Sequence, residues 1–314
     1  MENYCVIDLG SNTVKLTVTQ IDDQGRTKNI ISDKRTVRLS EDMGPEMVLK
    51  KPAIDRTIKA LSDFHKEFAN LPNLTVRAVA TAATRMAKNK QDFIKAAEEK
   101  AKIKVDVITG NHEAYYDYLS VVNSLPVVNC VIMDSGGAST EIILVQDKHI
   151  SRLTSIPLGA VTLTEKYLHT DKVSASDMFN IFSNMENLYN NMWWLHQGQN
   201  LPVVALGGSN RTLAKIQIRA DNAKKYLDVH GFRMSNYTAN HIFDQIISSN
   251  LEQRKQIPGL SKDRADIIVG GLTPVISLLR HLDSDRLIFS NNGLRDGILR
   301  EHLNYLRSNG DIGK

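Results

Sequence analysis

Residues 131–145 read VIMDSGGASTEIILV, and this stretch decides how the rest of the chain is interpreted. Three apolar residues lead to Asp134 at the end of a predicted strand, a run of small residues then turns the chain, and Glu141 opens an apolar return strand. A turn with so little side-chain bulk exposes backbone N–H groups, and two neighbouring acids suit a divalent cation. The pattern therefore favours a phosphate group held together with a metal. The alternative is a tight hairpin whose glycines only permit positive φ angles.

The same pattern occurs a second time near the N-terminus. Residues 4–18 read YCVIDLGSNTVKLTV, again an apolar strand, an acid, a small turn and an apolar strand. At a constant spacing of 126 residues the two copies align Asp8 with Asp134, Gly10 with Gly136, Ser11 with Gly137 and Thr13 with Ser139. A duplicated turn is much harder to explain as a chance hairpin. Two such turns facing each other across a cleft would grip a phosphate chain from both sides.

Composition and charge narrow the class of protein. The 314 residues suffice for two domains, and contents of 42% hydrophobic and 24% charged residues are typical of globular proteins in water. No apolar run is long enough for a membrane helix and no signal-peptide pattern is present, so we expect a cytoplasmic protein without a membrane partner. Cys5 and Cys130 are predicted to be buried, reduced thiols. A net charge of +4 does not require nucleic acid as a partner, and the basic stretches 84–104 and 211–233 suit a polyanionic substrate or are solvated helix faces.

Three further stretches contain candidate site residues. Arg85 ends the segment TAATR after a predicted strand and suits a bidentate phosphate clamp, with an ordinary surface arginine as the alternative. Glu113 lies in GNHEA at the start of a predicted helix, where it is a candidate general base for water or simply complements the helix dipole. A third glycine turn suits contact with a nucleotide or a polyphosphate tail, or is a plain strand-to-helix turn. It comprises Gly207, Gly208, Ser209, Asn210 and Arg211.

Two other stretches of the sequence lead to predictions, the basic residues 211–233 and an apolar stretch in the middle of the chain. The basic residues of stretch 211–233 are candidates to line the path of a polyphosphate tail; they are Arg211, Lys215, Arg219, Lys224 and Lys225. Apolar residues at helical spacing predict one helix over residues 178–195. The apolar stripe of this helix, together with Trp193 and Trp194, is predicted to pack in the core.

Taken in order, the motifs resemble one family. They read VIDLGSNT, ATAATR, ITGNHEA, DSGGASTE, PLGAVTLTE, LGGSN, PGLSKDRAD and NNGLRDGIL. Across essentially the whole chain this set is similar to that of the exopolyphosphatase / guanosine pentaphosphate phosphohydrolase (Ppx/GppA) family. The resemblance implies an α/β fold, the two-domain actin/hexokinase/chaperone-ATPase (ribonuclease H-like) superfold with duplicated phosphate-binding hairpins. It implies ribonuclease H-like domains over residues 1–125 and 126–296, with a terminal helix, about 297–314, packed back on the first domain.

The resemblance also implies roles for single residues. Glu113 matches the family's catalytic glutamate, and Arg85 matches its phosphate-binding arginine. Asp134 and Glu141 match acids associated with a divalent metal, Mg²⁺ or Mn²⁺, and Asp8, their counterpart on the first hairpin, is a third candidate metal ligand. The predicted phosphate-binding turns comprise Gly10, Ser11, Asn12, Thr13, Gly136, Gly137, Ala138, Ser139 and Thr140.

Three positions depart from the family pattern: His112 stands in place of an acid, Ser135 of an isoleucine and Ala138 of a glycine. The implied reaction is metal-assisted, in-line attack of water that releases terminal orthophosphate from inorganic polyphosphate. The alternative substrate is guanosine pentaphosphate (pppGpp), cut at its 5′ γ-phosphate. The sequence offers no clear purine pocket that would decide between the two substrates. A kinase of the same superfold and a weakly active protein that senses polyphosphate or nucleotides also stay open. The resemblance allows a homodimer.

Overall fold

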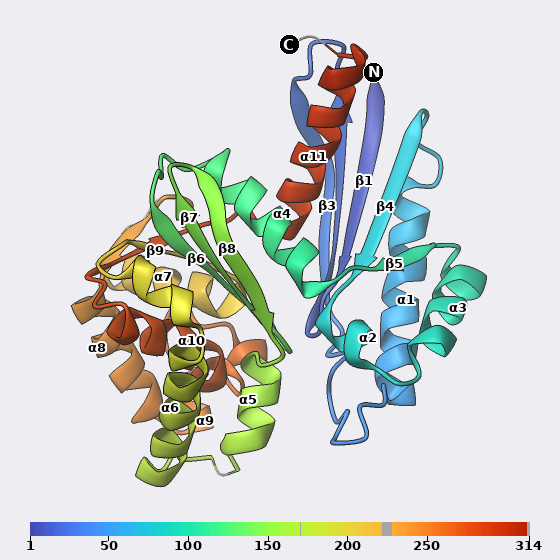
Figure 1. The fold of residues 1–314 in the computed structure, drawn as a ribbon. Helices are drawn as coiled ribbons and strands as arrows, with labels where there is room; N and C mark the ends of the chain where they lie inside the picture. Colours follow the sequence, from blue (N-terminus) through green and yellow to red (C-terminus); the bar gives the residue numbers. More distant parts are fainter. Residues whose placement is uncertain (170, 222–227, 313–314) are drawn as a thin grey trace. The chain divides into compact units, whose positions relative to one another are not determined.

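The computed structural model describes residues 1–169, 171–221 and 228–312, and the chain divides into two compact α/β units (Figure 1). Unit 1 comprises Met1–Ser120 and Leu294–Lys314, and unit 2 comprises Val121–Gly293. The sequence places these divisions after residues 125 and 296. The first observed division falls inside a helix, α4, so no turn or loop marks it in the sequence.

Unit 1 is a mixed sheet with helices on both faces. In the described part of this unit the strand order is β3-β2-β1-β4-β5, in which β1 pairs with β2 antiparallel and with β4 parallel. Its elements are β1 Glu2–Leu9, β2 Thr13–Ile21, β3 Thr27–Thr36, α1 Lys51–Phe68, β4 Leu74–Ala80, α2 Ala82–Met86, α3 Lys90–Ala101, β5 Val105–Val107, α4 Gly110–Val122 and α11 Leu294–Asn309.

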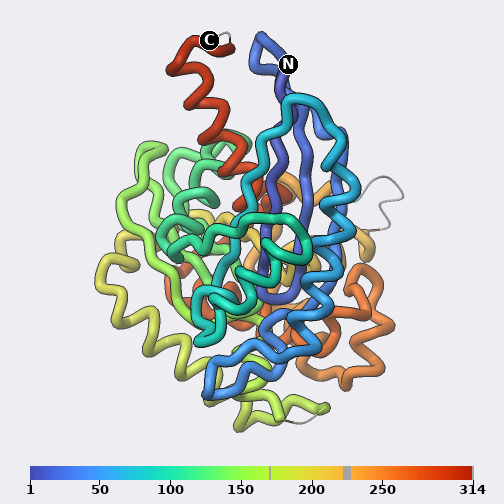
Figure 2. Tube along the Cα trace, turned by 90° about the vertical axis from the view of Figure 1, so that its right-hand side faces the viewer, coloured from blue at the N-terminus to red at the C-terminus, as the bar shows by residue number. Residues whose placement is uncertain are grey.

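The alternation of side chains along β1 explains how helices cover both faces of this sheet. Cys5 and Ile7 belong to one buried cluster, which α1 and α3 complete. Tyr4 and Val6 point the other way, into a second cluster that contains residues of α4 and α11. Figure 2 shows α1 and α3 on the near side of the strands of unit 1. A strand that is apolar on both faces therefore lies at the centre of the sheet.

Helix α11 returns from the end of unit 2 to pack on unit 1, as the resemblance implies. It lies against β1, and its Gly297 meets the backbone of α4 so closely that any side chain there would overlap the carbonyl oxygen of Tyr116. The hydroxyl of Tyr116 donates a hydrogen bond to Glu301 Oε2 over 2.9 Å. Glycine at position 297 thus permits the two helices to touch.

Unit 2 repeats the strand order of unit 1 around its own hairpin and adds one strand, β10, at the edge of the sheet. Among its described residues the order is β10-β11-β9-β6-β7-β8, with β6 antiparallel to β7 and parallel to β9. The repeated order confirms the predicted α/β superfold with two related halves. The elements are β6 Cys130–Ser135, β7 Thr140–Gln146, β8 His149–Ile156, α5 Ala160–Tyr167, α6 Ala175–Asn190, η1 Trp193–Gly198, β9 Val203–Leu206, α7 Gly208–Ala220, β10 Arg233–Ser235, α8 Asn236–Ile247, α9 Leu251–Arg254, η2 Lys262–Arg264, α10 Ile268–His281 and β11 Arg286–Phe289.

The prediction of one helix over residues 178–195 is wrong. Helix α6 ends at Asn190, and a separate 3₁₀ helix, η1, follows. Trp194 and Leu195 of η1 enter the same core as α6, so the apolar spacing continues across the break. Trp193, predicted to pack, is 64% exposed. Periodicity alone does not reveal the break because both segments bury apolar side chains against the same core.

Both cysteines are free and buried, as predicted. Burial raises the pKa of the Cys5 and Cys130 thiols to about 12, so both remain protonated and unreactive at neutral pH. Within the residues that the structure describes, no helix has the length and apolar character needed to cross a membrane.

Candidate functional site

The two predicted phosphate turns close their hairpins in the same way. In unit 1 the N–H of Gly10 donates to the carbonyl oxygen of Thr13 over 3.1 Å, and in unit 2 the N–H of Gly136 donates to that of Ser139 over 2.9 Å. Neither Gly10 nor Gly136 has a positive φ, and neither does Ala138. The glycines instead allow close approach, because a Cβ on Gly10 would lie 2.9 Å from the Thr13 oxygen. The alternative that these glycines serve positive φ angles is therefore wrong.

In unit 1, neighbouring backbone takes up the carbonyl groups of the turn. The carbonyl oxygen of Ser11 accepts from Ser40 N–H, and that of Asn12 accepts from the N–H groups of Val37 and Arg38, each over 3.0 Å. The N–H groups of Ser11 and Asn12 have no acceptor among the described residues. The turn therefore directs its donors, and not its acceptors, away from the protein, which suits an anion.

The side chain of Asn12 adds to this evidence. Asn12 is only 5% exposed, and neither Nδ2 nor Oδ1 finds a hydrogen-bond partner in the described structure. Buried polar atoms almost always have partners, so an orphaned amide indicates a place for a ligand or an ion. Thr84 Oγ1, next to Arg85 in the chain, is a second buried atom of this kind.

In unit 2, the start of α5 holds the turn. Ala160 N–H donates to the carbonyl oxygen of Gly136 over 2.9 Å, and Val161 N–H donates to that of Gly137 over 2.8 Å. Gly159 permits this approach, since a Cβ there would lie 2.7 Å from the Ala138 nitrogen and the Gly136 oxygen. As in unit 1, no described residue accepts from the N–H groups of Gly137 and Ala138.

Two of the departures from the family pattern have local explanations. The methyl group of Ala138 is fully buried and its backbone angle is an ordinary one, so alanine fits where the family has glycine. Ser135, at the end of β6, is buried and accepts a hydrogen bond from Asn210 Nδ2 over 3.5 Å. An isoleucine could not make that contact with the third glycine turn.

Arg85 and Glu113, which the sequence presents as separate candidates, form an ion pair. Arg85 lies on the short helix α2, and its Nη1 donates to Glu113 Oε2 and to the carbonyl oxygen of Ile108, each over 3.1 Å. Glu113 is in the first turn of α4. His112 is exposed, and its ring lies 6.3 Å from that of Tyr116, one turn further along α4. The structure therefore brings the predicted clamp and the predicted base together, with His112 directed elsewhere.

The acids of the hairpins occupy facing positions on paired strands. Asp134 on β6 is the register partner of Glu141 on β7, and Glu141 is 1% exposed, with its Oε1 accepting from Ser155 Oγ over 2.7 Å. Asp8 on β1 faces Lys15 on β2, whose Nζ donates to Asp8 Oδ2 over 3.0 Å.

This arrangement fits a divalent cation on the second hairpin. Asp134 and Glu141 are opposite each other on paired strands, which brings their side chains close enough for both to contact one ion. Two carboxylates supplemented by water are an ordinary ligand set for Mg²⁺. In the part of the chain that the structure describes, no group of three or more His, Cys, Asp or Glu side chains is assembled.

The third glycine turn lies against the second hairpin. Gly207 has a φ of +92°, and a Cβ there would be 2.6 Å from Asp134 Oδ1. The carboxylate of Asp134 thus lies beside the backbone at the start of α7. Within the described part of the chain, Ser209 Oγ and Asn210 Oδ1 are buried without hydrogen-bond partners, whereas Asn210 Nδ2 donates to the Leu206 carbonyl oxygen over 2.6 Å.

Two cations lie next to this turn: Lys215, which was predicted to line the path of a polyphosphate tail, and Arg264, for which the sequence predicted no role. The guanidinium of Arg264 covers Gly208 so closely that a side chain at 208 would overlap it. Burial lowers the pKa of Arg264, and the nearby charge of Arg211 lowers it further. Burial also lowers the pKa of Lys215, and the charges of Arg211 and Arg264 add to this shift. An anion among these three cations would relieve their repulsion. The sequence signal for Arg264 is its place in the polar stretch PGLSKDRAD, two residues after Lys262.

Lys224 and Lys225, which were predicted to line the path of a polyphosphate tail, lie outside the described residues.

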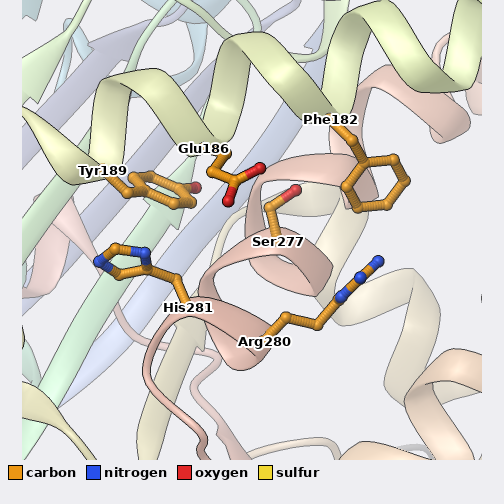
Figure 3. Close-up of a pocket in the computed structure, with 6 residues that line it drawn as sticks. All are labelled: Phe182, Glu186, Tyr189, Ser277, Arg280 and His281. Atoms are coloured by element: carbon orange, nitrogen blue, oxygen red, sulfur yellow. The ribbon is translucent and has the colours of Figure 1, made fainter.

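A cavity of about 230 Å³ between α6 and α10 is separate from the predicted site (Figure 3). Arg280 of this cavity lies 5.5 Å from the ring centroid of Phe182, and the Tyr189 hydroxyl donates to the carbonyl oxygen of Pro274 over 2.7 Å. The lining residues are Phe182, Glu186, Tyr189, Ser277, Arg280 and His281, none of which was predicted to bind phosphate or metal.

Comparison with known proteins gives consistent matches. A model of the Ppx/GppA phosphatase family matches residues 17–306. A guanosine-5'-triphosphate,3'-diphosphate pyrophosphatase of Pseudoalteromonas translucida is 29% identical over 314 residues, covering 99% of this chain and 61% of that protein. A bifunctional 3-dehydroquinate synthase/phosphatase of Fusobacterium nucleatum subsp. nucleatum is 28% identical over 306 residues, covering 94% of this chain and 46% of that protein. The chain thus spans about half to three fifths of the length of these curated relatives.

Solved structures agree with this assignment. An exopolyphosphatase from Cytophaga hutchinsonii has a TM-score of 0.91 at 24% identity, covering 97% of this chain and 98% of that one, a likeness of fold. The Aquifex aeolicus member of the Ppx/GppA family has a TM-score of 0.79 at 30% identity, covering 98% of this chain and 99% of that one. With a family model matching nearly its full length and a related structure of this identity, the chain belongs to the Ppx/GppA phosphatase family.

Proposed function

We propose that this chain is a phosphoanhydride hydrolase that releases terminal orthophosphate from inorganic polyphosphate. The observation that carries the proposal is the construction of the two turns. In each, neighbouring backbone takes up the carbonyl groups and leaves two consecutive N–H groups, Ser11 and Asn12 or Gly137 and Ala138, without an acceptor among the described residues. Phosphoryl transfer depends mainly on positioning and on neutralising charge, and such turns supply donors for both.

In unit 1 we assign phosphate binding to the turn and to Arg85, and the role of general base to Glu113, the ion-pair partner of Arg85. The N–H groups of Ser11 and Asn12 bind phosphoryl oxygens, and the same oxygens compete with Glu113 for the guanidinium of Arg85. Glu113 then accepts a proton from water as the water oxygen attacks phosphorus. The bond from phosphorus to the bridging oxygen breaks, and the polyphosphate chain leaves one phosphate shorter.

In unit 2 the proposed roles are the binding of phosphate and of a cation. Asp134 and Glu141 would hold Mg²⁺ or Mn²⁺, which when bound neutralises charge on phosphoryl oxygens. The N–H groups of Gly137 and Ala138 bind phosphate oxygens. The cations Arg211, Lys215 and Arg264 suit further phosphates of the same substrate, because each added anion relieves their mutual repulsion.

Guanosine pentaphosphate is the second candidate substrate. The name of the Pseudoalteromonas translucida relative favours it, and the three cations near Gly208 suit its phosphates as well as those of a polymer. The two substrates differ in the guanosine, for which the predicted site residues form no recognised pocket.

Release of orthophosphate by the purified chain tests the proposal. Medium-chain polyphosphate and pppGpp are compared at equal phosphate concentration with Mg²⁺, and again with EDTA. We expect release from polyphosphate that EDTA abolishes and that added Mg²⁺ restores. Release from pppGpp alone would favour the second substrate. Tight binding of either compound with no release would overturn the hydrolase assignment and favour a sensing protein.

A further inference from the structure

The cavity between α6 and α10 is built from one face of each helix in unit 2. Side chains three and four residues apart lie on the same face of a helix, and both helices contribute at this spacing. The residues are Phe182, Glu186 and Tyr189 on α6 and Ser277, Arg280 and His281 on α10. Figure 3 shows the two sets on opposite sides of the cavity. None of them belongs to the phosphate turns or takes part in the proposed hydrolysis, so the cavity has no role in that function.

A buried hydroxyl without a partner lies in this cavity. Ser277 is 7% exposed, and its Oγ has no hydrogen-bond partner among the described residues. A serine or threonine inside a helix can donate to the carbonyl oxygen four residues earlier, as Thr273 of α10 does toward Val269 over 2.8 Å. Ser277 does not make the corresponding bond, and Figure 3 shows its hydroxyl directed toward α6. Because a buried polar atom normally has a partner, this hydroxyl indicates a place for a polar atom of a ligand.

Two opposite charges line the same cavity and do not pair with each other. Glu186 and Arg280 are both exposed, and in the described part of the chain neither side chain forms an ion pair or a hydrogen bond. The guanidinium of Arg280 lies 5.5 Å from the ring centroid of Phe182 instead. Burial lowers the pKa of His281, so its ring is neutral at neutral pH. The lining therefore presents one negative and one positive charge, each available to a ligand.

This charge balance and the size of the cavity define the class of ligand. A polyphosphate or a nucleotide does not suit the lining, because the carboxylate of Glu186 repels an anion and cancels the charge of Arg280. The volume of about 230 Å³ is also smaller than the roughly 300–1,000 Å³ of sites for drug-sized ligands. The rings of Phe182 and Tyr189 add apolar surface, since the Tyr189 hydroxyl is already bonded to the Pro274 carbonyl oxygen. A small molecule with two opposite charges and an apolar part fits these conditions.

We propose that the α6–α10 cavity binds a small zwitterion, an α-amino acid with an apolar side chain. The carboxylate of the ligand accepts hydrogen bonds from Arg280, and its ammonium group donates to Glu186. The hydroxyl of Ser277 bonds to one of these two groups. The apolar side chain of the ligand packs against the rings of Phe182 and Tyr189. This site is independent of the proposed function, because none of its residues takes part in the phosphate chemistry.

Calorimetric titration of the whole chain with L-valine, L-leucine, L-methionine and L-phenylalanine tests the proposal. We expect at least one of them to bind, at one site per chain. The amide of the tightest ligand lacks the carboxylate, and its desamino analogue lacks the ammonium group. Each analogue should bind about tenfold more weakly, because it leaves one charge of the cavity without a partner. No binding of any of the four amino acids at millimolar concentration overturns the proposal, as does a desamino analogue that binds as tightly as its amino acid.

Single substitutions locate the binding. Glu186→Gln and Arg280→Gln should each weaken it about tenfold, and Ser277→Ala about 2- to 10-fold. Ser277→Ala removes a hydroxyl that has no partner in the described structure, so its melting temperature should not fall and loss of binding cannot arise from unfolding. Glu252→Gln and Arg286→Gln make the same charge changes at positions of unit 2 that are 76% and 57% exposed, and should not alter the affinity. Unchanged affinity in all three cavity variants, or an equal loss in the two controls, overturns the proposed site.

Discussion

Replacing Glu113 by glutamine should abolish most turnover and leave the fold intact. The carbonyl oxygen of the glutamine can still accept the hydrogen bond that Arg85 Nη1 donates over 3.1 Å, but the amide cannot take a proton from water. A positioned general base contributes about 10²–10⁴-fold to a rate, which corresponds to about 3–5 kcal/mol of activation free energy. We therefore expect kcat for orthophosphate release to fall by about 10²–10⁴-fold.

The same substitution should have a much smaller effect on stability. The side chains of Arg85 and Glu113 keep 24% and 12% of their exposure, and an ion pair with access to water contributes about 0.2–1 kcal/mol. The free energy of unfolding of a domain is about 5–15 kcal/mol, so the variant remains folded. The large fall in turnover therefore cannot arise from unfolding.

Initial rates of orthophosphate release at saturating polyphosphate give kcat, and equilibrium dialysis gives substrate binding, which should change little. The matched control is Glu99→Gln, which removes the same charge from an ion pair with Lys95 on α3, where Glu99 is 60% exposed. Turnover of Glu113→Gln close to that of the wild type would refute the assignment of the base. An equal loss in both variants would show that net charge, and not proton transfer, sets the rate.

Three further predictions concern a helix contact, a strained glycine and a buried hydrogen bond. Gly297→Ala forces α11 away from the Tyr116 carbonyl and should lower the free energy of unfolding by about 1–3 kcal/mol in urea titrations; unchanged stability would contradict the helix contact. Gly207→Ala places a side chain at a φ of +92° and should lower stability by about 1–2 kcal/mol and also reduce turnover, and a variant with wild-type melting and rate would exclude strain at this turn. Tyr189→Phe removes the hydrogen bond to Pro274 and should lower stability by about 1 kcal/mol with turnover unchanged, whereas a loss of activity at wild-type stability would connect the α6–α10 cavity to catalysis.

The sequence by itself determined the features that depend on neighbouring residues. A hairpin is built from two consecutive strands and a short turn, so the apolar runs and small residues at 4–18 and 131–145 were enough to locate both turns. Their repetition at a fixed spacing predicted two related halves, which the repeated strand order confirms. The motifs in their order predicted the family, which the match over residues 17–306 confirms.

Only the tertiary structure decided which distant residues meet. Arg85 and Glu113 are 28 residues apart and pair because β4 and β5, the strands that precede α2 and α4, are neighbours in one sheet. Arg264 covers Gly208, and Gly297 touches α4, through contacts that no local pattern encodes. The register of paired strands likewise decided that Lys15 faces Asp8. Sequence patterns report the conformation of adjacent residues, whereas the meeting of separate segments depends on how strands and helices pack, which is a property of the whole fold.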